Sequence, residues 1–411
     1  MNFAEQLRIL QAAQGDPAKL ALATVDLKYP ELPEAERATL KEVLEAAAIP
    51  HWCDAAILAA LLGIPLEESA ARLAQLRGLT VVEPFKARGE TAVNVHEAAR
   101  LVLRKRMARK DQQRFQKLSA QAAKVFEQVH APAKRIERIY HRLCAESERG
   151  ATELEALNRQ WSGSARPEDY YALAAALKEL DDSQMVAGRA RAWSLLVIAW
   201  ARHSHGEVAQ LETAAREVLL LARETNDQGA EGEAQALLGD VLQAQGKLAE
   251  AQAAFREYLT ISRRLAEQDP SNAGWQRGLA VAHSKMGGVL QAQGKLAEAQ
   301  AAFGEDLTIS RRLAAQDPSN AGWQRDLALA CLEVARLETK LGRHAAALPL
   351  YDEAARIFGE LAVKAPGFAQ WAKDKQQVES ELASWRLMLQ LAKSPGSTAP
   401  EGPSPASGVT P

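Results

Sequence analysis

The chain has 411 residues, of which 47% are hydrophobic and 25% charged, and its formal net charge is -2. This composition is typical of globular proteins with large cores, and a charge near zero excludes a chain-wide attraction to nucleic acid or anionic lipid. Cys53, Cys144 and Cys331 lack the paired spacings of disulfide frameworks or zinc sites, and no run of about 18 apolar residues predicts a membrane span. We therefore expect a cytoplasmic protein that does not contact a membrane.

The front of the chain, residues 32–110, has the pattern of three short helices followed by a hairpin. A helix ends before Pro50, Asp54 can cap the second helix, and Pro65 opens the third. The stretches TVVEPF and TAVNV then predict two strands, joined by a polar turn that contains Gly89. This order predicts a small winged helix-turn-helix domain.

Two short motifs in this region carry a resemblance to a known family. Val95-His96-Glu97 resembles the Met-His-Asp-like triplet of NB-ARC or STAND-type signalling NTPases, and Gly15-Asp16-Pro17-Ala18 resembles their Gly-Leu-Pro-Leu turn. The resemblance implies that residues 1–31 correspond to the end of the helical domain of such an NTPase. It also implies that Pro17 and His96 are remnants of nucleotide contacts.

The chain lacks the phosphate-binding loop that such NTPases require. GxxxxGK followed by Ser or Thr occurs nowhere, and both QGK stretches are followed by leucine. We therefore expect no cofactor, and a separate NTPase subunit could complete the system. His96 could alternatively be a polar cap of the helix that starts near Glu97. A zinc motif of the HExxH type is excluded because Arg100 occupies the second ligand position.

A basic stretch follows the predicted hairpin and has two interpretations. Its eight cations stand against a single acid, Asp111, and they could form a solvated helix face or hold DNA phosphates. The third helix opens with Glu67 and Glu68, which argues against docking in the major groove. We expect no nucleic-acid partner. The cations are Arg100, Arg104, Lys105, Arg106, Arg109, Lys110, Arg114 and Lys117.

Residues 111–190 are predicted to form a helical connector, and an internal repeat begins after it. Of the 40 residues from Val241 to Ala280, all but four reappear 48 positions later. Identity that extends to exposed Lys, Gln and Arg indicates a recent duplication.

Each repeat has the pattern of two amphipathic helices around a glycine, Gly246 or Gly294, which suits a left-handed helix end. Together with Gly239 or Gly287, Ala251 or Ala299, and Phe255 or Phe303, these residues resemble the tetratricopeptide repeat. The period of 48 exceeds the usual length of about 34, so each helix should be about two turns longer. The resemblance implies an all-α fold, a TPR-like α-solenoid. Trp275 and Trp323 are predicted to lie in its core.

Two weaker units flank the duplicated pair, around Gly206 and Gly342. Residues 191–392 are thus predicted to hold four tetratricopeptide units and a C-terminal capping helix that follows Pro366. The Pro-, Gly- and Ser-rich residues 393–411 predict a disordered tail.

A repeat array of this kind implies a function in binding. The first helices of stacked hairpins line a concave groove, which here should take a polar or acidic protein or peptide. No arrangement of nucleophile and base, and no metal-ligating spacing, is found, so we predict a non-catalytic scaffold or sensor arm. The alternative is a DNA-binding transcriptional regulator whose repeats sense a ligand. The predicted groove and rim residues are Gln243, Lys247, Ser284, Gln291, Lys295, Arg336, Thr339, Lys340 and Arg343.

Overall fold

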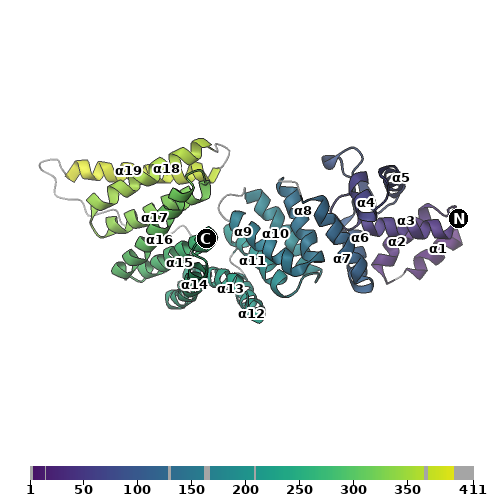
Figure 1. Cartoon of the computed structure of the whole chain (residues 1–411), viewed down its shortest axis with the longest axis horizontal. Coiled ribbons are helices and arrows are strands. Elements are labelled where there is room, and N and C mark those ends of the chain that lie inside the picture. The colour runs from purple at the N-terminus through teal and green to yellow at the C-terminus, as the bar shows by residue number, and fades with distance from the viewer. Residues whose placement is uncertain are drawn as a thin grey trace. The chain divides into compact units, whose positions relative to one another are not determined.

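A computed structural model describes residues 3–13, 15–127, 131–161, 167–207, 210–364 and 369–392. The predicted tail, residues 393–411, and Pro366 lie outside the described residues. The chain divides into two compact units, Met1–Gln245 (unit 1) and Gly246–Pro411 (unit 2), and this division falls inside the range predicted for the repeats. Figure 1 labels the helices of both units.

Unit 1 contains all the strands found among the described residues. Its elements are α1 (Phe3–Ala12), α2 (Pro17–Lys28), α3 (Glu34–Ala47), α4 (Ala55–Leu62), α5 (Leu66–Leu76), β1 (Val82–Pro84), the 3-10 turn Lys86–Arg88, β2 (Val93–Val95), α6 (Glu97–Lys110), α7 (Gln112–Val125), α8 (Pro132–Ala145), α9 (Ser147–Trp161), α10 (Pro167–Asp182), α11 (Gly188–Ser204), α12 (Leu211–Glu224) and α13 (Gln228–Ala244).

Helices α3, α4 and α5 and the antiparallel pair β1–β2 follow the order predicted from the sequence. Asp54 caps α4 by accepting a hydrogen bond from the Ile57 amide, 2.8 Å, and Cys53 forms an isolated bridge to Val93. Both strands are shorter than predicted, and one more backbone hydrogen bond, from the Phe85 amide to the Ala92 carbonyl at 2.9 Å, precedes the 3-10 turn. The winged-helix assignment itself stays a prediction.

The connector, residues 111–190, is helical where the structure describes it. Helices α8 and α9 approach each other closely at Gly150, where a Cβ would lie 2.6 Å from the backbone nitrogen of Leu143. Any larger residue there would force the two helices apart.

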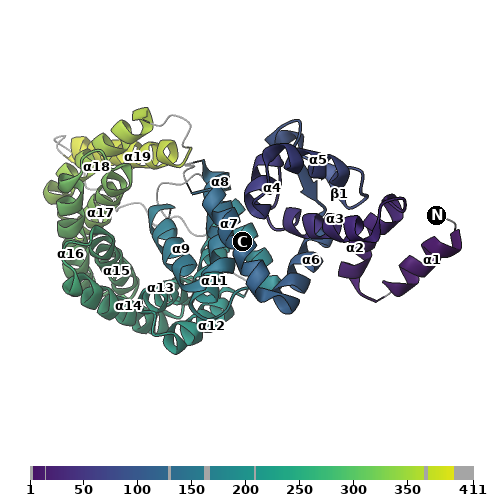
Figure 2. The same ribbon diagram turned by 45° about the vertical axis from the view of Figure 1, so that its right-hand side comes forward.

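Unit 2 consists of long helices arranged as successive hairpins, and α15 to α19 lie side by side in chain order (Figure 2). The turn glycines Gly294 and Gly342 have φ of +78° and +74°, as the left-handed helix end requires. Gly206 in unit 1 has the same conformation, with φ of +76°. The helices are α14 (Leu248–Gln268), α15 (Ala273–Ala292), α16 (Leu296–Gln316), α17 (Ala321–Lys340), α18 (His344–Lys364) and α19 (Ala369–Ala392).

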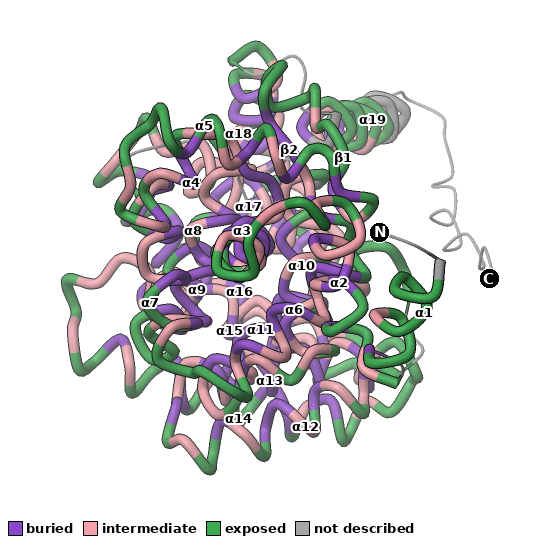
Figure 3. The backbone as a smooth tube through the Cα atoms, turned by 90° about the vertical axis from the view of Figure 1, so that its right-hand side faces the viewer, coloured by how far each residue is buried: buried purple, intermediate pink, exposed green. Residues whose placement is uncertain are grey.

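The small residue and the phenylalanine of the repeat fit each other. Phe303 is 3% exposed, and a Cβ on Gly287 would lie 2.6 Å from its ring. Figure 3 shows buried positions recurring along the helices. Trp275 and Trp323 are half-buried, and Trp323 packs against the buried residues Ala280, Ile309 and Leu313, as its assignment to the core predicted. Both lie in the first turn of their helices.

Taken together, the chain is all-α, with the helical hairpins of a TPR-like solenoid. The structure contains no helix, among the residues it describes, that is long and apolar enough to cross a membrane.

Candidate binding surface

The predicted groove residues of unit 2 lie along α15 and α17. Ser284, Gln291, Arg336 and Thr339 are half-buried, and Lys340 is exposed. Lys247, Lys295 and Arg343 are exposed and lie in the turns that precede α14, α16 and α18. Gln243 lies on α13 and belongs to unit 1.

Two of these residues form hydrogen bonds to the first helix of the following hairpin. The Ser284 hydroxyl contacts both carboxylate oxygens of Glu333, at 3.0 and 2.8 Å. Arg336 donates to the two oxygens of Glu381 on α19, at 3.0 and 2.6 Å. The structure therefore connects α15 to α17 and α17 to α19 through the predicted residues. We call the surface formed by these three helices the first-helix face.

The rim residues make weaker contacts. Lys295 approaches the side-chain oxygen of Gln252 at 3.5 Å, and Arg343 donates to Gln300 at 3.3 Å. These side chains stay largely open to solvent, so a ligand could displace such contacts at little cost.

Ion pairs form further rungs between successive repeats. Arg277 on α15 donates to Asp326 on α17, with Nε–Oδ2 at 2.5 Å. One repeat later, Arg325 on α17 donates to Asp374 on α19 at 3.1 Å. Asp326 stands where the preceding copy has Gly278, so one of the four differences between the copies creates a rung.

A second difference between the copies lies in contact with that position. The Tyr258 hydroxyl donates to the Gly278 carbonyl at 3.3 Å, and the next copy has Asp306 and Asp326 at these two places. Asp306 is 6% exposed and accepts a hydrogen bond from Ser310. Burial, followed by the charge of Glu333, raises the pKa of Asp306 to about 8.

Burial likewise raises the pKa of Glu333. The hydrogen bonds from Ser284 favour the carboxylate and oppose this shift, but burial outweighs them. The first-helix face therefore carries carboxyl groups as well as cations, which fits a polar or mixed-charge peptide better than an acidic one. Sequence reasoning missed Asp306 and Glu333. For Asp306 the available signal was the short set of differences between two otherwise identical copies, whereas Glu333 lies beyond the copied stretch.

Pro17 and His96, the residues that resemble nucleotide contacts, are both largely exposed. Pro17 is the first residue of α2, and Asp16 caps that helix by accepting from the Ala18 and Lys19 amides. His96 occupies the N-cap position of α6, but its side chain makes no capping hydrogen bond. His96 thus stands at the predicted cap position, but its Nδ1 lies 3.8 Å from Glu83 and does not bond to the helix amides. Whether either residue contacts a nucleotide stays a prediction.

The basic stretch is not a single solvated face. Arg100 and Arg104 are buried and both pair with Glu179, at 2.5 and 3.1 Å. Arg106 pairs with Asp16 at 3.6 Å, and Arg114 pairs with Glu45 at 2.7 Å. Four of the eight cations thus form ion pairs within the protein, which weakens the case for a DNA-binding surface.

Arg100 and Arg104 belong to a buried ionic cluster in unit 1. His51, in the loop before α4, places Nδ1 2.7 Å from Glu137 on α8 and Nε2 3.6 Å from Glu179 on α10. Tyr140 donates to Glu179, and Arg104 lies over the Tyr140 ring, 4.3 Å from its centre. We call these residues, together with His141, the ionic cluster.

The pKa shifts in the ionic cluster follow from its contacts. Burial alone would lower the pKa of His51, but the charge and hydrogen bond of Glu137 outweigh burial and raise it. Burial lowers the pKa of His141 to about 4, so this ring is neutral. The pKa of Glu179 is lowered despite its burial, because His51, Arg104 and Arg100 favour the carboxylate. No local sequence pattern reveals this cluster, because its members come from four distant segments.

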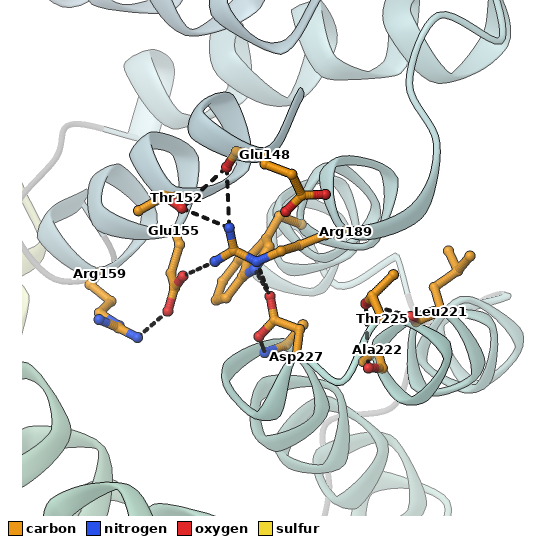
Figure 4. Close-up of polar contacts among 11 residues, drawn as sticks. Glu148, Thr152, Glu155, Arg159, Arg189, Leu221, Ala222, Thr225 and Asp227 are labelled. Carbon is orange, nitrogen blue, oxygen red and sulfur yellow. Dashed lines mark hydrogen bonds and ion pairs between the residues drawn. The ribbon is translucent and has the colours of Figure 1, made fainter. Parts of the chain in front are cut away.

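A second polar junction joins three helices of unit 1 (Figure 4). Arg189, at the start of α11, donates to Asp227 at 2.6 Å, to Glu155 at 2.5 Å and to Thr152 at 2.7 Å. Asp227 is also the N-cap of α13 and accepts from the Trp193 indole. One guanidinium thus ties α9 and α11 to the start of α13.

The remaining candidates for reactive groups are the cysteines and the possible metal ligands. The three cysteines are free and buried, and burial raises the pKa of Cys144 to about 11 and that of Cys331 to about 12. A buried neutral thiol is a poor nucleophile. Over the described part of the chain, no three His, Cys, Asp or Glu side chains gather as a metal site would require.

Comparison with known proteins agrees with the repeat. Residues 233–271 match the model of the tetratricopeptide repeat family. None of the curated proteins matches the chain. Among solved structures, the chain is similar to a STAND protein with a tetratricopeptide repeat sensor from Pyrococcus horikoshii. The two are 12% identical with a TM-score of 0.44, over 97% of this chain and 64% of that protein.

Two further solved structures are similar over shorter stretches. A putative kinesin light chain from Podospora anserina is 18% identical with a TM-score of 0.34, over 56% of this chain and 98% of that one. NprR, solved in complex with its cognate peptide NprX, is 17% identical with a TM-score of 0.32, over 72% of this chain and 82% of that one.

Proposed function

We propose that this chain is a non-catalytic scaffold or sensor arm that binds a protein or peptide on the first-helix face. The observation that carries this proposal is the set of polar contacts that joins α15 to α17 and α17 to α19, of which the pairs Arg277–Asp326 and Arg325–Asp374 occupy matching positions of successive hairpins. The tetratricopeptide match at residues 233–271 supports it.

The ladder suits binding because it fixes the side chains before a partner arrives. Ordering long polar side chains costs about 0.5–1.5 kcal/mol each on association, and contacts that already hold them reduce this cost. Gln291 and Lys340 lie next to the ladder, half-exposed and exposed, and make polar groups available to a partner. Exposed backbone groups of an extended peptide could bond to such side chains.

Photo-cross-linking from two matched positions tests this proposal. The full chain would carry a benzoylphenylalanine in place of Gln291 on α15, or in place of Thr308, an exposed residue on the second helix α16. We expect a discrete cross-linked partner from native lysate at position 291, and none at position 308. Equal labelling at both positions, or none at either, would contradict a specific first-helix face.

The proposal extends to a STAND-type signalling system in which a separate NTPase subunit acts with this chain. It is supported by the motif resemblance around Pro17 and His96 and by the helix and strand order from α2 to α6. Because the phosphate-binding loop is absent from the sequence, we expect the purified chain to release no nucleotide on denaturation. Stoichiometric ADP in that preparation would refute the proposal that a separate subunit binds the nucleotide.

A further inference from the structure

Unit 1 contains a cavity of about 380 Å³ that none of the preceding functions uses. It lies where the junction of α6 and α7, the junction of α8 and α9 and the turn before α11 meet. Phe115, Leu143, Met185 and Val186 give it apolar walls. A volume of this size falls within the range of small-molecule sites, roughly 300–1,000 Å³.

All the charged side chains that line the cavity are positive. Lys105 and Arg109, one turn apart on α6, both line the cavity, and its lining includes no Asp or Glu. Within the described ranges, neither cation takes part in an ion pair. Both belong to the basic stretch, whose members Arg100 and Arg104 are instead neutralised by Glu179.

Three of the acids next to the cavity walls in the sequence are ion-paired with other residues, and Asp111, next to Gln112, caps α7 by accepting from the Arg114 amide. Asp181 pairs with Arg191 at 2.7 Å, and Asp182 pairs with Lys178 at 2.6 Å. Glu146 pairs with Arg142 at 2.8 Å. None of these acids pairs with Lys105 or Arg109, so an anion entering the cavity would meet two cations beside apolar walls.

Two features of the wall add polar groups and a constrained shape. Gln184 lines the cavity with φ of +57° because it ends α10 in a left-handed turn, in which the Met185 amide donates to the Leu180 carbonyl at 3.0 Å. Ser147, another lining residue, begins α9, and the first-turn amides of a helix have no acceptor within that helix.

We propose that this cavity binds a small organic anion, with a phosphate or carboxylate head held by Lys105 and Arg109 and an apolar body against Phe115, Leu143 and Met185. The site is separate from the first-helix face and does not depend on the peptide-binding proposal. Cys144, which also lines the cavity, accepts a contact from Arg104 at 3.7 Å, so the cavity and the ionic cluster share a wall.

Titration calorimetry on the full chain tests this site with three probes: phenyl phosphate, 3-phenylpropanoate and the neutral 3-phenylpropanol. We expect at least one anion to bind with one-to-one stoichiometry, and the alcohol to bind at least about tenfold more weakly. The anion that binds more tightly identifies the head group. Failure of both anions to saturate the protein, or equal affinity for the alcohol, would overturn the proposal.

Paired charge variants locate the site. Lys105→Gln with Arg109→Gln should weaken anion binding by about tenfold or more, because two charged hydrogen bonds are lost. Lys110→Gln with Lys117→Gln makes the same change in net charge at two exposed residues outside the cavity, and should leave affinity unchanged. Equal weakening in both pairs would show non-specific attraction and contradict the site.

A filling substitution tests the cavity without altering charge. Ala108→Phe should abolish anion binding, since Ala108 lines the cavity between the two cations. If that variant melts earlier than the parent chain, Ala108→Leu takes its place. Binding that persists undiminished in the folded variant places the anion elsewhere and overturns the proposal.

Discussion

The two units hold their charged side chains in different ways. In unit 1 the ionic cluster joins residues far apart in the sequence, such as Arg100 and Glu179, and encloses them almost completely. In unit 2 the ion pairs are partly exposed and link one hairpin to the next, as Arg277 and Asp326 do with side chains 23% and 19% exposed. Unit 2 thus behaves as a repeat in which each hairpin depends on its neighbours, whereas the ionic cluster makes distant segments of unit 1 depend on one another.

This difference implies different responses to mutation. Removing one member of a buried ion pair leaves an uncompensated charge, which is far more costly than losing a surface pair. A single charge change should therefore disturb unit 1 broadly, while an equivalent change in unit 2 should remain local.

The largest effect is expected from Glu179→Gln in unit 1. It leaves Arg100 and Arg104 buried without a counter-charge and should reduce the free energy of unfolding by about 3–5 kcal/mol. Urea denaturation followed by circular dichroism measures it. Glu360→Gln, in an exposed pair with Arg356, is the matched control and should change little. A loss below about 1 kcal/mol for Glu179→Gln would remove the contrast between the units.

Phe303→Ala should cost about 3–5 kcal/mol by creating a cavity in unit 2. Gly287→Ala alone should cost about 1–3 kcal/mol, because its Cβ would lie 2.6 Å from the Phe303 ring. In the Phe303→Ala background, Gly287→Ala should cost much less, since the ring is gone. A double-mutant cycle measures this coupling, and simple additivity would contradict the proposed fit of ring and glycine.

Asp306→Asn should change how unit 2 responds to pH. The folded pKa of about 8 lies above the ordinary value of 3.8, so ionisation of Asp306 opposes folding. The parent chain therefore loses stability as pH rises from about 4 to about 8. The variant should melt at least about 2 °C above the parent at pH 8.5, with a smaller difference at pH 4. Calorimetric melting at both pH values checks this, and a constant difference would contradict a buried, protonated Asp306.

The smallest effect is expected from Arg336→Ala, which removes the rung to Glu381. The Arg336 side chain is 39% exposed, and that of Glu381 is 27% exposed. Such pairs contribute about 0–1 kcal/mol and weaken with salt. Denaturation at low and high salt measures it. A loss as large as that of Glu179→Gln would mean that the ladder of unit 2 is as essential as the ionic cluster.

The repeat made much of the fold predictable from the sequence. Spacing alone placed Gly206, Gly294 and Gly342 at left-handed helix ends, and the structure confirms each one. Phe255 and Phe303 are buried as expected. Local patterns suffice here because each hairpin is built from residues close in the chain.

The polar interior of unit 1 could not be predicted in this way. His51 and Glu137 are 86 residues apart, and nothing near either residue indicates its partner. The same holds for the cavity, where Lys105 meets the turn around Gln184 only after folding. Charge density alone marked residues 100–117 as a surface, whereas the three-dimensional structure distributes these cations among the interior, surface pairs and a cavity.

The paired differences between the two copies limit how the array could change its length. A deletion of 48 residues within the copied stretch keeps turns and buried rings in register, because like positions are joined. A deletion beginning between residues 259 and 278, however, would retain Tyr258 and Asp326 while removing Gly278 and Asp306. The tyrosine would then face a carboxylate in place of glycine. Shortened chains should therefore survive selection more readily when their junction falls outside that interval.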